Sequence, residues 1–450
     1  MVKVYLVTLG CPKNEVDSAG MAARLREAGH VLVERPASAD ALIVNTCGFI
    51  APAREESLRV IRELARRKRP GQLLVAAGCM VTLHGDELRS IPGVDVLLGV
   101  DRLATVAEFL AEPERAVPTL PSPPLPYPGA GLSAVHGGSA YLKIADGCDA
   151  RCAFCTIPRI KGPYRSASRE VLLGEVQRLV AQGVQEIVLV AQDTTAYGRD
   201  RGEADGLPGL IEAVLEAVPE LPWLRIMYTY PQHITPRLID TIARYPQVCP
   251  YLDIPLQHAH PATLARMGRP TNVERVRVLL RRLRERIPDL VLRTTFIVGY
   301  PGETEAEFAA LRAFLEEQAF ERVGVFVYSR EAETPAAQLP DPVPEEVAFS
   351  RREELMALQQ EIARRWGQRQ VGRIVPVLVE GIDRRAGLVV GRTRWDAPEV
   401  DGLVFAQGRA RVGTIVPVQI TAASAYDLWG TVVPERDRQG DPASQGSNRL

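Results

Sequence analysis

Residues 147–155 read GCDARCAFC, which places Cys148, Cys152 and Cys155 in a C-x3-C-x2-C pattern. Three thiolates this close together can wrap one face of a cubane iron–sulfur cluster. Such clusters normally take four cysteine ligands, so three leave one iron open to bind a substrate, as catalytic metal centres do. Zinc is the alternative, but zinc sites usually have four nitrogen or sulfur ligands, and no fourth Cys or His lies close in sequence. The spacing therefore favours an iron–sulfur cluster over a zinc ion.

The cysteine pattern belongs to a segment, residues 140–329, in which apolar strands alternate with amphipathic helices. Six such units indicate an incomplete version of the eight-stranded α/β barrel, whose open side would admit a large substrate. The expected strands are Tyr141–Ala145, Glu186–Ala191, Leu224–Tyr228, Tyr251–Pro255, Val291–Val298 and Arg322–Tyr328. Active sites of these barrels lie at the carboxyl ends of the strands, and the cysteine pattern follows the first strand. The barrel context therefore supports a catalytic site at the three cysteines.

The first 111 residues also alternate strands with helices, which is typical of a parallel sheet covered on both faces. The expected strands are Val4–Val7, Ala41–Val44, Leu73–Ala76 and Val94–Leu98. Cys11, Cys47 and Cys79 follow the first three of them. Because ligands bind at the carboxyl ends of strands in open parallel sheets, these thiols would meet in one crevice and could hold a second metal centre. The alternative is that they act as small buried apolar side chains, the role we assign to the seventh cysteine, Cys249.

Composition divides the chain into five segments. Residues 1–111 form the N-terminal domain and residues 140–366 the barrel, and the proline-rich stretch 112–139 between them is expected to be a linker. Residues 367–434 contain short strands separated by turns, which predicts a small all-β barrel. Residues 435–450 are polar and are expected to be disordered. The predicted fold class is α/β multidomain: a parallel-sheet domain, a partial (β/α)6 barrel and a small β-barrel.

Charge and hydropathy exclude several classes of protein. The formal net charge of −1 provides no general attraction to nucleic acid. No stretch has the roughly 20 consecutive apolar residues of a membrane-spanning helix, and the N-terminus lacks the layout of a signal peptide. Seven cysteines without a secretory signal point to metal ligation or catalysis rather than to disulfides. We therefore expect a cytoplasmic protein with no membrane partner.

The chain as far as about residue 434 resembles the radical S-adenosylmethionine (SAM) methylthiotransferases. That superfamily is marked by the C-x3-C-x2-C spacing with an aromatic residue before the third cysteine, here Phe154. The three N-terminal cysteines and a β domain similar to the TRAM module narrow the resemblance to methylthiotransferases. The RimO-type branch, which modifies a ribosomal protein, is similar in three stretches: LGCPKN at 9–14, MYTYP at 227–231 and GRTRWDAPEVDG at 391–402. The tRNA-modifying branch typically has Gln-Met where this chain has Pro12-Lys13.

The resemblance implies an activity, cofactors and partners. The protein would add a methylthio group to the β-carbon of an aspartate in ribosomal protein uS12, free or in the assembling small subunit. It would use two 4Fe-4S clusters and two molecules of SAM per turnover. The barrel cysteines would hold the cluster that generates the radical and the N-terminal cysteines the cluster that carries the sulfur, with no catalytic residue beyond these ligands. A flavodoxin or ferredoxin would donate electrons to a monomeric enzyme.

Four residues are expected to contact SAM beside the open iron. Phe154 precedes the third cysteine, Gln192 and Asp193 end the second barrel strand, and Gly299 ends the fifth. Simpler roles exist for three of them. Gln192 and Asp193 would serve equally well as a cap or loop at the start of a helix, and Gly299 as part of a tight turn.

Two other functions remain open, and one departure from the family pattern bears on them. The first is the same chemistry on adenosine in tRNA, and the second is a non-catalytic, zinc-binding adaptor. The family usually has Arg-Ser-Arg shortly after the cluster motif, whereas this chain reads Arg165-Ser166-Ala167. Arg169 is the nearest candidate to replace the second arginine.

Overall fold

The computed structural model describes residues 1–111, 132–269 and 272–434. The chain forms two compact units, the first ending at Gln359 and the second beginning at Gln360. Most of the predicted linker, residues 112–131, and the predicted disordered tail, residues 435–450, lie outside the described residues.

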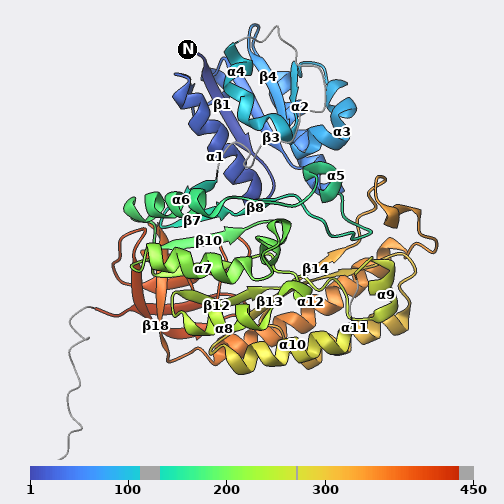
Figure 1. Cartoon of the computed structure of the whole chain (residues 1–450), viewed down its shortest axis with the longest axis vertical. Helices are drawn as coiled ribbons and strands as arrows, with labels where there is room; N and C mark the ends of the chain where they lie inside the picture. The colour runs from blue at the N-terminus through green and yellow to red at the C-terminus, as the bar shows by residue number, and fades with distance from the viewer. Residues whose placement is uncertain (112–131, 270–271, 435–450) are drawn as a thin grey trace, which may run out of the picture. The chain divides into compact units, whose positions relative to one another are not determined.

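The N-terminal segment folds as a five-stranded sheet with helices on both sides (Figure 1). Its strands are β1 (Lys3–Thr8), β2 (Val31–Leu32), β3 (Ala41–Thr46), β4 (Leu73–Gly78) and β5 (Val96–Leu98). Its helices are α1 (Pro12–Glu27), α2 (Ala51–Arg67), α3 (Cys79–Arg89) and α4 (Val106–Ala111), with the 3-10 helices η1 (Pro36–Ser38) and η2 (Val100–Thr105). The order is β2-β1-β3-β4-β5 and every pairing is parallel. The four predicted strands are present, and the two-residue edge strand β2 was not predicted.

Each face of this sheet is covered by a different pair of helices. On one face, Met21 and Leu25 of α1 and Phe109 of α4 pack on alternate residues of the central strands. On the other face, Ile61 of α2 and Leu88 of α3 pack on the intervening residues. Burial on both faces explains why the central strands are apolar throughout. Because the strands are parallel, the loops that carry the three N-terminal cysteines all leave from the same edge of the sheet.

The barrel segment contains a seven-stranded sheet in the order β14-β13-β12-β11-β10-β7-β6. Its strands are β6 (Ser133–His136), β7 (Ser139–Lys143), β10 (Glu186–Val190), β11 (Trp223–Ile226), β12 (Val248–Asp253), β13 (Val291–Val298) and β14 (Arg322–Val327). The six predicted strands pair in parallel, which confirms the incomplete barrel. Residues 133–136, which the sequence placed in the linker, instead form β6, antiparallel to β7. This hairpin was missed because the proline-rich composition of the preceding stretch dominated the prediction.

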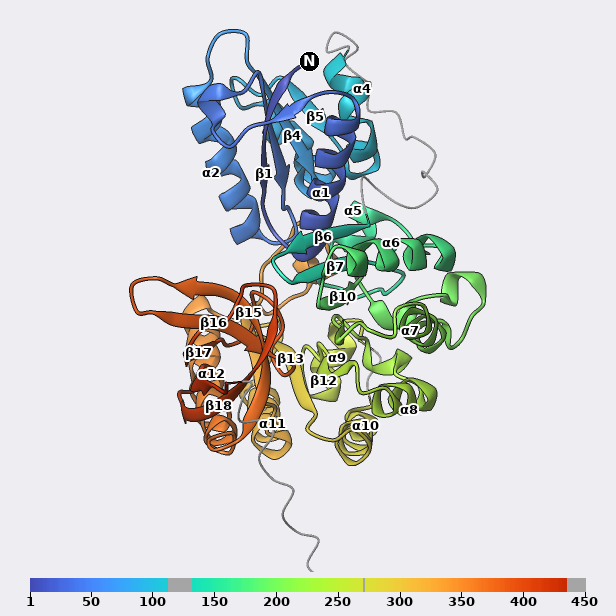
Figure 2. The same cartoon turned by 90° about the vertical axis from the view of Figure 1, so that its left-hand side faces the viewer.

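Helices alternate with the barrel strands as predicted. They are α5 (Ile157–Lys161), α6 (Arg169–Ala181), α7 (Gly206–Ala217), α8 (Pro236–Arg244), α9 (Pro261–Arg266), α10 (Val273–Arg286), α11 (Glu305–Gln318) and α12 (Glu345–Gln368). The remaining elements are η3 (Thr194–Ala196), η4 (Arg199–Arg201), η5 (Pro231–His233) and η6 (Pro335–Gln338), and the short pair β8 (Ala145–Asp146) and β9 (Arg165–Ser166). Helices α6, α7, α8, α10 and α11 cover one face of the sheet (Figure 2). Local signals fix their starts: Thr304 and Glu307 form a reciprocal capping box at α11.

The second unit contains a closed five-stranded barrel, as predicted. Its strands are β15 (Ile374–Asp383), β16 (Leu388–Thr393), β17 (Val404–Gln407), β18 (Ile415–Ala423) and β19 (Leu428–Val432), in the order β15-β16-β17-β19-β18. Closure leaves no free strand edge on so small a sheet. None of the helices in the described parts of the chain has the length and apolar character needed to cross a bilayer.

Candidate functional site

The structure brings the three N-terminal cysteines together at the carboxyl edge of their sheet. Cys11 stands at the N-cap of α1, Cys47 directly follows β3, and Cys79 is the first residue of α3. Cys79 is close enough to Cys11 and Cys47 for both to act on its pKa. A Cβ atom on Gly10 would lie only 3.0 Å from the sulfur of Cys47, so the Cys11 and Cys47 loops also touch. We name these residues the N-terminal triad.

Asn14, which the sequence analysis did not single out, connects all three loops of the N-terminal triad. Its side-chain amide donates to the carbonyl oxygens of Leu9 at 2.8 Å and Thr46 at 3.1 Å. Its side-chain oxygen lies 3.6 Å from the sulfur of Cys79. The sequence did contain a signal for this role. Asn14 is a polar residue in the first turn of helix α1, three residues after the candidate ligand Cys11.

The second group of cysteines lies in the loop between β8 and α5, and we name Cys148, Cys152 and Cys155 the barrel triad. All three are partly exposed. The loop is anchored at Ala153, whose N–H donates to Met267 at 2.8 Å and whose carbonyl accepts from Ala336 at 2.9 Å. These anchors join the cysteine loop to segments far away in the chain.

Arg269 is a second residue that the sequence analysis missed. Its guanidinium group lies 3.7 Å from the sulfur of Cys152 and 4.3 Å from the centre of the Tyr230 ring. The positive charge also acts to lower the pKa of Cys155, against the larger effect of burial. Arg269 therefore provides a cation and a hydrogen-bond donor directly beside the barrel triad.

Burial controls the protonation of the thiols. It raises the pKa of Cys79 and of Cys155 to about 12, that of Cys148 to about 11, and that of Cys47 above its ordinary value. Metal ligation requires thiolates, so loading of either triad releases protons. In the described ranges, no group of three or more His, Cys, Asp or Glu side chains is drawn together tightly enough to hold a single metal ion. Iron–sulfur clusters take cysteine thiolates as ligands, so the three cysteines of each triad are donors of the kind that a cluster needs.

Two contacts join the N-terminal segment to the barrel segment near the triads. The hydroxyl of Thr156, next to Cys155, donates to the carbonyl of Phe49 in the loop after Cys47 at 3.4 Å. Lys13, two residues after Cys11, reaches the ring of Tyr228 beyond the end of β11, 3.6 Å from its centre. Burial, and then the neighbouring Cys11 thiol, raise the pKa of Tyr228.

A buried group of four charges lies beside this contact. Asp17 of α1 forms ion pairs with Lys143 of β7 and, at 3.0 Å, with Lys161 of α5. Both lysines also lie 3.5 Å from Asp146. Burial alone would lower the pKa of Lys161, but Asp146, Asp17 and the Cys79 thiol raise it well above its ordinary value. The sequence analysis did not identify this group, because its members are charged residues on four separate elements.

Two of the expected SAM contacts lie near the barrel triad: Phe154 precedes Cys155, and Asp193 is close enough to Cys148 to act on its pKa. Phe154 packs against the buried cluster around Tyr300. Asp193 does not cap the backbone of η3; its carboxylate accepts from Thr195 and lies 2.7 Å from His233 Nδ1. Gly299 has a φ of +71°, its N–H donates to Glu303, and a Cβ there would lie 2.4 Å from Ala348. The turn geometry by itself thus explains the glycine.

Arg201, rather than Arg169, lies against the position where the family usually has its second arginine. Arg201 donates to the carbonyl of Ala167 at 2.9 Å, and its guanidinium group lies 5.1 Å from the ring centre of Tyr197. Arg169 instead pairs with Glu203 at 3.3 Å. A replacement role for Arg169 is therefore not supported.

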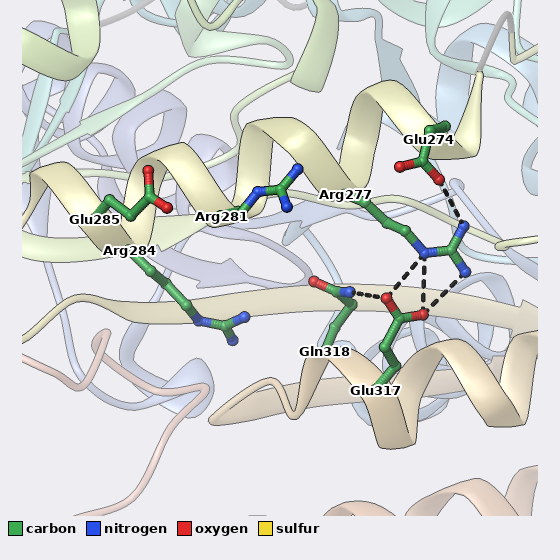
Figure 3. Close-up of a pocket in the computed structure, with 7 residues that line it drawn as sticks. All are labelled: Glu274, Arg277, Arg281, Arg284, Glu285, Glu317 and Gln318. Carbon is green, nitrogen blue, oxygen red and sulfur yellow. Dashed lines mark hydrogen bonds and ion pairs between the residues drawn. The ribbon is translucent and has the colours of Figure 1, made fainter.

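A surface pocket of about 510 Å³ lies between α10 and α11, away from all predicted site residues (Figure 3). Its walls carry charged and polar side chains: Glu274, Arg277, Arg281, Arg284, Glu285, Glu317 and Gln318. Arg277 is bound by Glu317 at 3.0 Å and by Glu274 at 3.4 Å. Three arginines and three glutamates line the pocket, so their charges cancel and favour no charged ligand. No cysteine of either triad is among the lining residues.

Family models match the three folded parts of the chain. Residues 3–99 match the uncharacterized protein family UPF0004, residues 142–315 match the radical SAM superfamily, and residues 371–433 match the TRAM domain. Solved structures share the fold at low identity. The radical SAM methyltransferase TsrM from Kitasatospora setae is 17% identical with a TM-score of 0.57, covering 74% of this chain and 76% of its own. The cobalamin-dependent radical enzyme OxsB is 12% identical with a TM-score of 0.52, covering 80% and 56%.

Full-length relatives are much more similar in sequence. The ribosomal protein uS12 methylthiotransferase RimO of Roseiflexus sp. strain RS-1 is 50% identical, covering 96% of this chain and 97% of its own. RimO of Chloroflexus aurantiacus is also 50% identical, covering 95% and 99%. The chain therefore belongs to the RimO family of ribosomal protein uS12 methylthiotransferases, within the radical SAM superfamily.

Proposed function

We propose that the protein is a radical SAM enzyme that adds a methylthio group to the β-carbon of an aspartate in ribosomal protein uS12. The observation that supports this proposal is the hydrogen bond between the loop after Cys47 and the residue after Cys155. A single triad would support only a radical generator, whereas the contact between Thr156 and Phe49 links the loop of one triad to that of the other. Insertion of sulfur requires a second metal centre, close to the radical-generating one, that carries the sulfur.

The cysteine thiolates of each triad support the proposal of one cluster per triad. Cys148, Cys152 and Cys155 would hold one 4Fe-4S cluster, and the N-terminal triad would hold the other. Together with two molecules of SAM, these groups supply the electron, the radical and the sulfur chemistry, which acid–base side chains cannot supply. With three cysteine ligands apiece, each cluster would retain an open iron.

The chain's own residues bind and orient these groups. Asn14 holds the three loops of the N-terminal triad in register. Arg269 provides a positive charge at the sulfur of Cys152. Phe154, Gln192, Asp193 and Gly299 are proposed to line the place of SAM, with the Asp193 carboxylate held by Thr195 and His233. Because both oxygens of Asp193 have partners, its orientation is fixed before any ligand arrives.

We further propose that the enzyme acts as a monomer in the cytoplasm, on uS12 that is free or in the assembling small subunit. A flavodoxin or ferredoxin would deliver the electrons. The cytoplasmic location is proposed from the substrate named for the relatives, since a ribosomal protein is reached where ribosomes assemble.

Anaerobic reconstitution tests the proposed function. The protein is loaded with iron and sulfide, supplied with SAM and a reductant, and incubated with uS12 and with tRNA in parallel. We expect about eight irons per chain and a methylthio mass increase on one aspartate of uS12. Modification of tRNA adenosine with uS12 unchanged would replace the proposal by the tRNA activity. Tight zinc without iron would point to the adaptor instead.

A further inference from the structure

Lys13 is a buried cation without a carboxylate partner among the described residues, and its charge acts to lower the pKa of the neighbouring Cys47 thiol. Only 7% of the residue is exposed. Its ammonium group lies over the ring of Tyr228, and no carboxylate in the described part of the chain forms an ion pair with it. Burying a charge without a partner is costly, and a cation–π contact offsets only part of that cost. An ammonium has three donors and no acceptor, so it retains the capacity to bind an anion.

Lys13 lies beside one of the cysteines of the N-terminal triad and beside the end of a barrel strand. It lies two residues after Cys11, and the Tyr228 ring that it covers stands at the carboxyl end of the barrel strand β11. Tyr228 is fixed there with a positive φ of 59°, because its carbonyl accepts from the N–H of Thr194 at 2.9 Å. The contact therefore lies between the N-terminal triad and the strand ends, where barrels of this type hold reacting groups.

The two residues come from the two stretches near the site that distinguish the ribosomal-protein branch in the sequence. Lys13 belongs to the stretch at 9–14 and Tyr228 to the stretch at 227–231. The tRNA branch typically has uncharged Gln-Met at positions 12 and 13. A cation at this point suits a substrate group that carries a carboxylate.

We propose that the ammonium group of Lys13 binds the side-chain carboxylate of the substrate aspartate, while the ring of Tyr228 holds the ammonium in position. The inference rests on the function proposed above. The carbon to be modified is bonded directly to that carboxylate, so one ion pair both selects aspartate and orients its β-carbon. A neutral asparagine, equal in size, gains much less from the ammonium.

The test compares binding of two forms of uS12 to the reconstituted enzyme. One form carries the target aspartate, and the other carries asparagine at that position. We expect the wild-type enzyme to bind the aspartate form about 10- to 100-fold more tightly, the range of a hydrogen bond to a charged group. In Lys13→Met this ratio should fall to about one, and Lys13→Arg should restore part of it. The exposed Lys3 gives the matched control, and Lys3→Met should keep the full ratio.

The outcomes separate this inference from the proposed function. A wild-type enzyme that modifies no uS12 at all would refute the function. A wild-type enzyme that modifies uS12, together with Lys13→Met that still prefers aspartate, would overturn the inference alone. Iron content and the visible spectrum are measured in every variant. Lys13→Met that loses N-terminal iron yet keeps the aspartate preference would assign Lys13 to the metal centre and would also overturn the inference.

Discussion

The barrel triad and the N-terminal triad have the same donors but are built in opposite ways. The barrel triad lies within a single loop, its cysteines are partly exposed, and a guanidinium group stands beside it. The N-terminal triad is assembled from three strand ends, two of its cysteines are buried, and a single asparagine connects its loops. The comparison shows that the arrangement of ligands within one loop depends mainly on that loop. The arrangement of ligands at three strand ends depends on the whole sheet.

Removal of one ligand from each triad should produce the largest effects. Cys152→Ala should abolish cleavage of SAM, because the radical-generating centre is lost. Cys47→Ala should keep cleavage of SAM but form no methylthio product, because only the sulfur-carrying centre is lost. Quantification of 5′-deoxyadenosine and of modified uS12 checks both, with about four irons expected to remain in each variant. Loss of SAM cleavage in both variants would contradict the separation of roles.

Breaking the buried group of four charges around Asp17 should give the next largest effect. Asp17→Asn removes a carboxylate that pairs with both Lys143 and Lys161, and loss of one partner from a buried ion pair costs about 3–5 kcal/mol. Urea denaturation measures the change in the free energy of unfolding. Asp240→Asn is the control, since Asp240 pairs with Arg286 at an exposed site and should cost less than about 1 kcal/mol. Equal losses of unfolding free energy in the two variants would show that the buried ion pairs of Asp17 stabilise the fold no more than an exposed pair does.

A smaller effect is expected from crowding the N-terminal triad. Gly10 has a φ of +98°, and a Cβ there would lie 2.7 Å from the Cβ of Cys47. Gly10→Ala should therefore displace Cys47 and lower iron binding at this triad while the barrel triad stays loaded. Gly29 has a φ of +80° and open space around it, so Gly29→Ala carries only the conformational cost of about 1–2 kcal/mol. Iron analysis should find Gly29→Ala fully loaded, and an equal loss in both variants would rule out the steric explanation.

The smallest effect is expected at Arg269. A cation beside a cluster ligand stabilises the reduced, more negative state, so Arg269→Leu should shift the midpoint potential of the barrel cluster to more negative values. The N-terminal cluster should keep its potential. A redox titration followed by electron paramagnetic resonance resolves the two clusters. Arg277→Leu in the pocket between α10 and α11 is the control, and a shift of both potentials by Arg269→Leu would argue against a local effect.

Much of the fold was predictable because its signals are local. Apolar runs located the six barrel strands, and amphipathic stretches predicted that helices alternate with them. The hairpin strand β6 was missed because the adjacent proline-rich composition pointed to a linker. The two-residue strand β2 was missed because so short a strand has no periodicity of its own.

The sequence by itself determined the donor chemistry of both triads. The spacing of Cys148, Cys152 and Cys155 is a property of one loop. Cys11, Cys47 and Cys79 each follow a strand, and parallel strands end at the same edge of a sheet, so the strand pattern alone predicts that these three lie together. The tertiary structure alone decided what surrounds the thiols. Lys13 meets Tyr228, Asp17 meets Lys161 and Arg269 meets Cys152 across more than one hundred residues of chain. Such contacts leave no periodic trace in the sequence, because they depend on how separately folded elements pack against one another.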